Sequence, residues 1–108
     1  MPSGEAPDAR LADAVLARID RLFVPDARVA AAALLAERCG GNLPGTGGWP
    51  AHAIERIQVA ALKLSGGDFA ALIEAVRIAN IDWRDVLVAA GFGHDTRAHE
   101  SWWPGASR

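Results

Sequence analysis

The sequence has a single cysteine, Cys39, so it cannot form a disulfide bond within the chain. Its first residues, Met1 to Glu5, have neither the basic patch nor the apolar run of a secretory signal peptide. We therefore expect a protein of the reducing cytoplasm. The sequence also lacks any stretch that approaches the roughly 20 apolar residues needed to cross a bilayer, so we expect no membrane partner.

An excess of positive charge is also absent. Eleven basic residues face thirteen acidic residues, which gives a formal net charge of −2. Proteins that bind nucleic-acid phosphates usually carry a concentrated basic surface. The segment from Asp68 to Gly91 has the form of a helix-turn-helix motif, but Asp82 and Asp85 stand at the end that would meet DNA. We expect no nucleic-acid partner.

Catalytic signatures are missing as well. No serine stands in a Gly-x-Ser-x-Gly elbow. Cys39 is expected at a helix C-terminus, where the partial negative charge disfavours a thiolate, so we expect it to be a buried apolar residue. Paired acids such as Asp82 and Asp85 suit the chemistry of a helix start. The sequence therefore assigns no catalytic residue and no cofactor, and it leaves open whether the protein is an enzyme.

Helical spacing of apolar side chains is what the sequence does contain. Three such segments lie between Ala53 and Phe92, and the links between them are only two or three residues long. Links this short fold neighbouring helices back on one another, so this block predicts the core of an all-α domain. The apolar positions of the first two segments are Ile54, Ile57, Ala61, Leu62 and Leu64, and then Phe69, Leu72, Ile73 and Val76; the third segment is the run from Trp83 to Ala90.

Residues that favour helix ends agree with this spacing. Asp68 and Asp82 each precede a helix, where a carboxylate can accept bonds from the free N–H groups of the first turn. Asn80 can close the second helix by adopting a left-handed conformation. Gly91 followed by Phe92 suits a Schellman ending of the third helix.

Two further helices are predicted upstream and a short one downstream. The first carries the stripe Leu11, Val15, Ile19, Leu22 and Phe23 and is stopped by Pro25, which also starts the next helix at Asp26 to Cys39. The last helix is expected near Thr96 to Trp103, with Asp95 as its cap. The sequence thus predicts a compact bundle of five or six short helices, one domain over residues 8–103, with flexible ends at 1–7 and 104–108.

The glycine-rich segment from Gly40 to Pro50 is long for a helix connection and leads into a helix N-terminus that can hold an anion. It fits no phosphate-loop motif, because Gly-Lys-Ser/Thr is absent and the only lysine is Lys63. We favour a crossover that Leu43 and Trp49 pin to the bundle. The alternative is a small-ligand or anion site, whose residues would be Gly47, Gly48, Trp49 and His52.

A second alternative is a metal site near the C-terminus. Asp95 and His99 would share one face of the last helix, and His52 can approach them from another helix. However, Asp95 has a competing role as a helix cap, and Glu100 points away from it around the helix axis. We therefore predict no metal site, and a metal-binding protein that uses His94 and His99 is the less favoured interpretation.

The adjacent tryptophans Trp102 and Trp103 cannot both face the same interior. If one is exposed, this end of the chain is a candidate interface, because large aromatic residues are favoured at protein contacts. The alternative is that both fold over the bundle from different sides. We expect a non-enzymatic protein-interaction or regulatory module, acting as a homodimer or bound to another protein.

Two stretches, Leu62 to Asp68 (LKLSGGD) and Asp82 to Phe92 (DWRDVLVAAGF), resemble small bacterial proteins of unknown function. The resemblance covers the C-terminal half of the chain. It implies a free-standing bacterial cytoplasmic domain, and it carries no known activity.

Overall fold

The computed structural model describes residues 11–40, 43 and 45–105, and within them it contains six α-helices and no strand. The helices are α1 (Asp13–Leu22), α2 (Pro25–Arg38), α3 (Ala51–Ser65), α4 (Phe69–Ile81), α5 (Trp83–Ala90) and α6 (Ala98–Ser101). The predicted all-α bundle is confirmed. The predicted flexible end at 1–7, residues 106–108 of the predicted flexible end at 104–108, and the predicted start of the domain at residue 8 lie outside the described residues.

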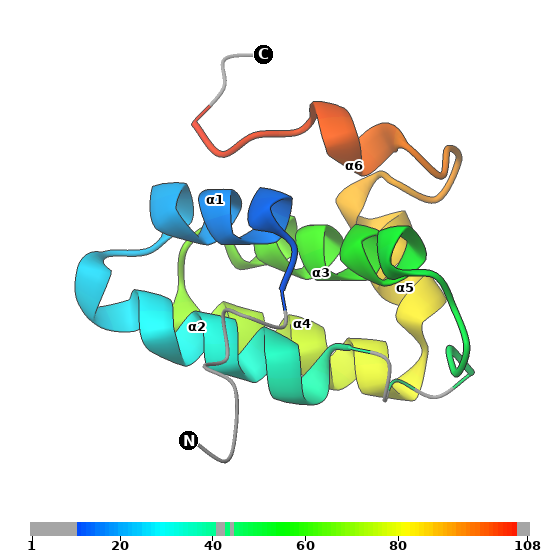
Figure 1. The fold of residues 1–108 in the computed structure, drawn as a ribbon, viewed down its shortest axis with the longest axis horizontal. Helices are drawn as coiled ribbons and strands as arrows, with labels where there is room; N and C mark the ends of the chain where they lie inside the picture. The colour runs from blue at the N-terminus through cyan, green and yellow to red at the C-terminus, as the bar shows by residue number, and fades with distance from the viewer. Residues whose placement is uncertain (1–10, 41–42, 44, 106–108) are drawn as a thin grey trace, which may run out of the picture.

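Helix α3 is the centre of the bundle. It packs against α1, α4, α5 and α6, while α2 packs against α1 and α4. Figure 1 shows α1 and α3 in one layer above α2 and α4, with α6 on the opposite side of the α1–α3 layer from α2 and α4. None of the helices in the described part of the chain is long and apolar enough to span a membrane.

The core contains most of the predicted apolar positions together with others, such as Leu35 and Val59, while Val88 of the predicted third helix is 71% exposed. Its largest fully buried aliphatic side chains are Val15, Ile19, Leu35, Ile57, Val59, Leu62, Leu72 and Val86. Ile73 was expected in the stripe of α4, but it is 47% exposed. The buried face of α4 passes through Leu72, Ala75, Val76 and Ala79 instead, so Ile73 lies at the edge of that face.

The helix ends of the central block follow the predicted capping chemistry. Asp68 accepts a hydrogen bond from the N–H of Ala70 at 3.3 Å, and Asp82 accepts one from the N–H of Arg84 at 3.1 Å. Helix α5 ends in the predicted Schellman motif, because Gly91 is left-handed and the N–H of the next residue, Phe92, donates to the carbonyl of Leu87 at 2.8 Å.

The predicted role of Asn80 is wrong. Asn80 remains helical, and α4 continues to Ile81, where the extended Asp82 both ends α4 and caps α5. The amide of Asn80 donates to the carbonyl oxygens of Arg38 and Val76, each at 2.8 Å. Its side chain therefore ties α4 to the end of α2, a tertiary contact that local propensity does not reveal.

The predicted last helix, Thr96 to Trp103, is shorter than expected. Asp95 does accept a hydrogen bond from the N–H of Arg97 at 2.9 Å, but α6 contains only Ala98–Ser101. The chain is extended at Trp102, and Arg18 binds the carbonyl oxygens of His99, Glu100 and Trp102. Pro104 follows and has no N–H to donate to the Glu100 carbonyl in a longer helix. The other deviations are small: α2 begins one residue early at Pro25, and α3 begins at Ala51.

Candidate functional site

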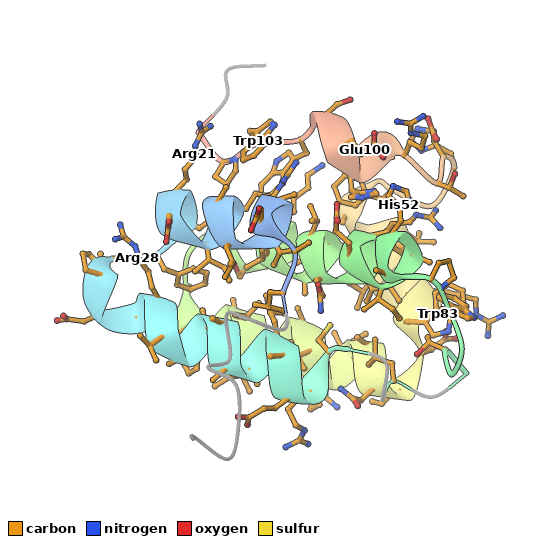
Figure 2. All side chains as sticks on the ribbon, in the orientation of Figure 1. Arg21, Arg28, His52, Trp83, Glu100 and Trp103 are labelled. Atoms are coloured by element: carbon orange, nitrogen blue, oxygen red, sulfur yellow. The ribbon has the colours of Figure 1, made fainter. Side chains whose placement is uncertain are left out.

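Four acid–base side chains gather where the first turn of α3 meets α6. We name His52, Glu55, His99 and Glu100 the His–Glu cluster. His52 and Glu55 are three residues apart, so they lie on one face of α3, and His99 and Glu100 come from the middle of α6. Figure 2 shows His52 and Glu100 close together in the space between these two helices.

The cluster consists of two histidine–carboxylate pairs. Nε2 of His52 is 2.6 Å from Oε2 of Glu100, and Nε2 of His99 is 3.2 Å from Oε2 of Glu55. The two imidazole rings lie next to each other, with centroids 4.9 Å apart. One ligand atom each of His52, His99 and Glu100 lies within 4.8 Å of the others.

His99 is completely buried, and its Nδ1 has no hydrogen-bond partner among the described residues. Burial lowers the pKa of His99, although the negative charge of Glu55 acts in the opposite direction. The ring is therefore neutral at neutral pH. Because a carboxylate only accepts hydrogen bonds, the proton belongs on Nε2, next to Glu55, and Nδ1 keeps a free lone pair.

Glu100 is the most acidic group of the cluster. Arg97 donates to its carboxylate from Nε at 3.1 Å and from Nη2 at 2.9 Å, and His52 contacts it from the other side. These bonds hold the pKa of Glu100 at about 2. A carboxylate with this pKa is charged at every physiological pH, so the cluster always offers one anionic oxygen ligand.

A buried arginine attaches the C-terminal residues to α1. Arg18 is 1% exposed, and its guanidinium donates to the carbonyl oxygens of Trp102 at 3.0 Å, His99 at 3.1 Å and Glu100 at 3.4 Å. Sequence reasoning missed Arg18. The available signal was its position between Val15 and Ile19 on the apolar stripe of α1, where a charged residue must find a buried partner.

Both C-terminal tryptophans are half-buried and fold onto the bundle. Trp102 packs against the hydrophobic core. Trp103 lies against two arginines of α1, with the guanidinium carbon of Arg18 3.8 Å and that of Arg21 4.7 Å from the ring centroid (Figure 2). In this arrangement the tryptophans serve internal contacts, and their role at an interface stays a prediction.

The described part of the glycine-rich segment is anchored at several points. Leu43 is buried, and the buried hydroxyl of Thr46 donates to its carbonyl oxygen at 2.9 Å. Trp49 packs edge-to-face on Trp83, with ring centroids 4.7 Å apart. These contacts agree with the interpretation of the segment as a crossover pinned by Leu43 and Trp49.

The four residues predicted for a ligand site in this segment have different surroundings. Gly47 and Gly48 are exposed, and no neighbouring side chain approaches the position of a Cβ at either of them. Trp49 packs on Trp83, whereas His52 belongs to the His–Glu cluster and contacts Glu100. A cavity of about 280 Å³ does lie nearby, but its lining includes Glu55 and Gln58 rather than Trp49 or His52.

The residues predicted for a metal site are only partly brought together. His52 does approach His99, as the metal interpretation required, and Glu100 joins them. His94 is exposed and does not belong to this group, and the side chain of Asp95 accepts the N–H of Arg97 instead. The sequence interpretation had named His52 and His99 as groups that could meet, and the structure brings these two together without His94.

No protein-family model, curated protein or solved structure matches this chain. The resemblance of its C-terminal half to small bacterial proteins stays a prediction. Function is therefore inferred from the geometry of the described residues alone.

Proposed function

We propose that this protein is a non-enzymatic regulatory module that binds another protein, or a second copy of itself, through residues 97–105, here named the C-terminal segment. The observation that supports the proposal is the way this segment is attached to the fold. Arg18 binds three of its carbonyl oxygens, and α3 holds it through two histidine–carboxylate pairs.

The rest of the bundle depends more on apolar packing, whereas in the C-terminal segment only Ala98 and Trp102 pack against the hydrophobic core. Helices α3, α4 and α5 meet through fully buried aliphatic side chains such as Ile57, Leu72 and Val86. A polar contact contributes only about 1 kcal/mol net, because water replaces it when it breaks. The C-terminal segment therefore opens at a lower free-energy cost than the core helices, and it can exchange internal contacts for contacts with a partner.

The side chains of this segment suit a protein contact. Trp103 is half-buried, and the exposed Arg21 lies against its ring. Tryptophan and arginine are the residues most enriched among interface hot spots. A partner that offers carboxylates beside an aromatic or aliphatic group would complement this pair.

The test replaces Trp103 by serine, with Trp49→Ser as the matched control. Both tryptophans are half-buried, but Trp49 packs on Trp83 at the other end of α3. Trp103→Ser is expected to weaken self-association or partner capture about 30-fold, equivalent to about 2 kcal/mol for one hot-spot residue. Trp49→Ser is expected to lower the melting temperature without this effect.

Light scattering gives the molecular mass of each variant, and capture from lysate of the native cell gives partner binding. Unchanged mass and unchanged capture for folded Trp103→Ser would contradict the proposal. The proposal includes the bacterial origin and cytoplasmic location that the resemblance implies, and it includes no nucleic-acid or membrane partner.

A further inference from the structure

The unpartnered nitrogen of His99 is the starting point of the inference. More than nine in ten buried polar groups in proteins have a hydrogen-bond partner, so an exception needs a physical explanation. His99 is 0% exposed, and its Nδ1 is without a partner among the described residues although its Nε2 is bonded to Glu55. A ring nitrogen that is buried without a partner is available as a ligand.

The groups next to His99 are also ligands. Each of His52, His99 and Glu100 has a ligand atom within 4.8 Å of the others. Ions with bonds of about 2.0–2.1 Å place tetrahedral ligand atoms about 3.3 Å apart, so these three side chains need to move by only about an ångström to share one ion. The short contact between His52 and Glu100, 2.6 Å, must widen slightly.

The composition of the cluster selects the class of ion. Two imidazoles and one carboxylate are typical ligands of zinc and similar transition metals, whereas calcium and magnesium prefer oxygen ligands throughout. The bond from Glu55 to Nε2 of His99 adds a second feature. Histidine ligands of metals usually donate their other ring N–H to a carboxylate, which fixes the tautomer and the ring orientation.

We infer that the His–Glu cluster binds a divalent transition-metal ion of the zinc type, with His52, His99 and Glu100 as ligands and Glu55 as the partner that orients His99. The three ligands leave a fourth position for water or for a group from a partner. This inference goes beyond the proposed function, because it is argued from the contacts within the His–Glu cluster and does not require a protein partner. Occupied, it would link α6 to α3 and so restrain the C-terminal segment.

Arg97 opposes the ion in this arrangement. Its guanidinium makes a bidentate ion pair with Glu100, the anionic ligand, so the ion must compete for that carboxylate. We therefore expect weaker affinity than at structural sites that have four committed ligands. Replacing Arg97 should strengthen binding, an effect of opposite sign to that of losing a ligand.

The experiment titrates tag-free, full-length protein with zinc chloride against a chromophoric zinc indicator. Wild type is expected to bind one equivalent. His52→Ala and Glu100→Gln are each expected to weaken binding more than 10-fold, and Glu55→Gln by about 10- to 100-fold, as for other partners of metal-bound histidines. His94→Ala is the matched control, because His94 is exposed, close in sequence and outside the cluster; its affinity should be unchanged.

Arg97→Ala provides a test that unfolding cannot imitate, since it should bind zinc at least several-fold more tightly than wild type. Bound Co²⁺ should show the visible absorption of a tetrahedral site, and this absorption should be lost in His52→Ala. Absence of stoichiometric zinc in wild type would overturn the inference, and so would zinc binding that His52→Ala and Glu100→Gln leave intact. The titration needs no self-association or partner, so its outcome is separate from that of the proposed function.

Discussion

Arg18 is a permanently charged side chain that the fold buries almost completely. Burial lowers its pKa, but a guanidinium stays protonated in proteins, so the charge must be stabilised where it lies. Carbonyl oxygens at the end of α6 and of Ala14 accept its hydrogen bonds, and the face of Trp103 covers it. Since carbonyls at a helix C-terminus carry partial negative charge, Arg18 acts as a cap supplied by another helix.

Cys39 is the second buried ionisable residue whose state can be tested. Its side chain is 0% exposed, and burial raises the pKa of the thiol from 9.0 to about 12. At pH 8 the thiolate fraction is then about 10³-fold lower than for a free cysteine. We expect reaction with a disulfide reagent at pH 8 to be slower than in denaturant by at least this factor. Rapid labelling of the native protein would show that Cys39 is accessible.

At the scale of the helices, one glycine controls how α3 turns into α4. Gly67 is left-handed, with φ of 90°, and a Cβ added to it would lie 2.5 Å from the carbonyl oxygen of Leu22 at the end of α1. Gly66 is also left-handed, but open space surrounds its Cβ position. Gly66 therefore meets only the strain of the left-handed backbone, whereas Gly67 also leaves no room for a side chain beside the end of α1.

We expect Gly67→Ala to destabilise the protein more than Gly66→Ala does. Each substitution forces a non-glycine residue into a left-handed conformation, at a cost of about 1 kcal/mol. Only Gly67→Ala also displaces the backbone of α1, which should bring its total to about 3 kcal/mol or more. Urea unfolding of the two variants measures the difference, and equal midpoints would mean that α1 does not approach this link closely.

Elements with local signals were predictable from the sequence. Helix α5 has the predicted ends, because its cap at Asp82 and its left-handed Gly91 depend only on neighbouring residues. Asn80 was misinterpreted because its amide binds the carbonyl of Arg38, a contact between residues distant in sequence. The contact of α6 with Arg18 could not be predicted for the same reason, since Arg18 lies in the first helix and binds carbonyl groups of α6.

The candidate site shows the same limit. The direction of the Glu100 side chain was predicted from its position on a helix that runs from Thr96 to Trp103. The observed α6 is shorter, so this prediction did not identify the neighbours of Glu100. Histidines 52 and 99 are adjacent only because α6 folds back over the first turn of α3. The metal alternative named His94 beside His99, and His94 is exposed in the structure.

At the scale of the whole molecule, the apolar core and the polar attachment of the C-terminal segment lie on opposite sides of α3. Helices α4 and α2 pack below the α1–α3 layer, and α6 lies above it in Figure 1. The core gives the bundle its stability, whereas the upper side holds charged and ionisable groups whose contacts can be exchanged. The regulatory role that we propose belongs to this upper side.

The most direct test of the account places a photo-cross-linking amino acid at Ser101, which is exposed at the end of α6, and at Ala30, which is exposed on α2, as the control. After irradiation in the native cell, the account predicts that position 101 links covalently to a partner protein or to a second chain, identified by mass spectrometry, and that position 30 does not. Cross-linking from position 30 with none from position 101 would contradict the claim that residues 97–105 bind the partner.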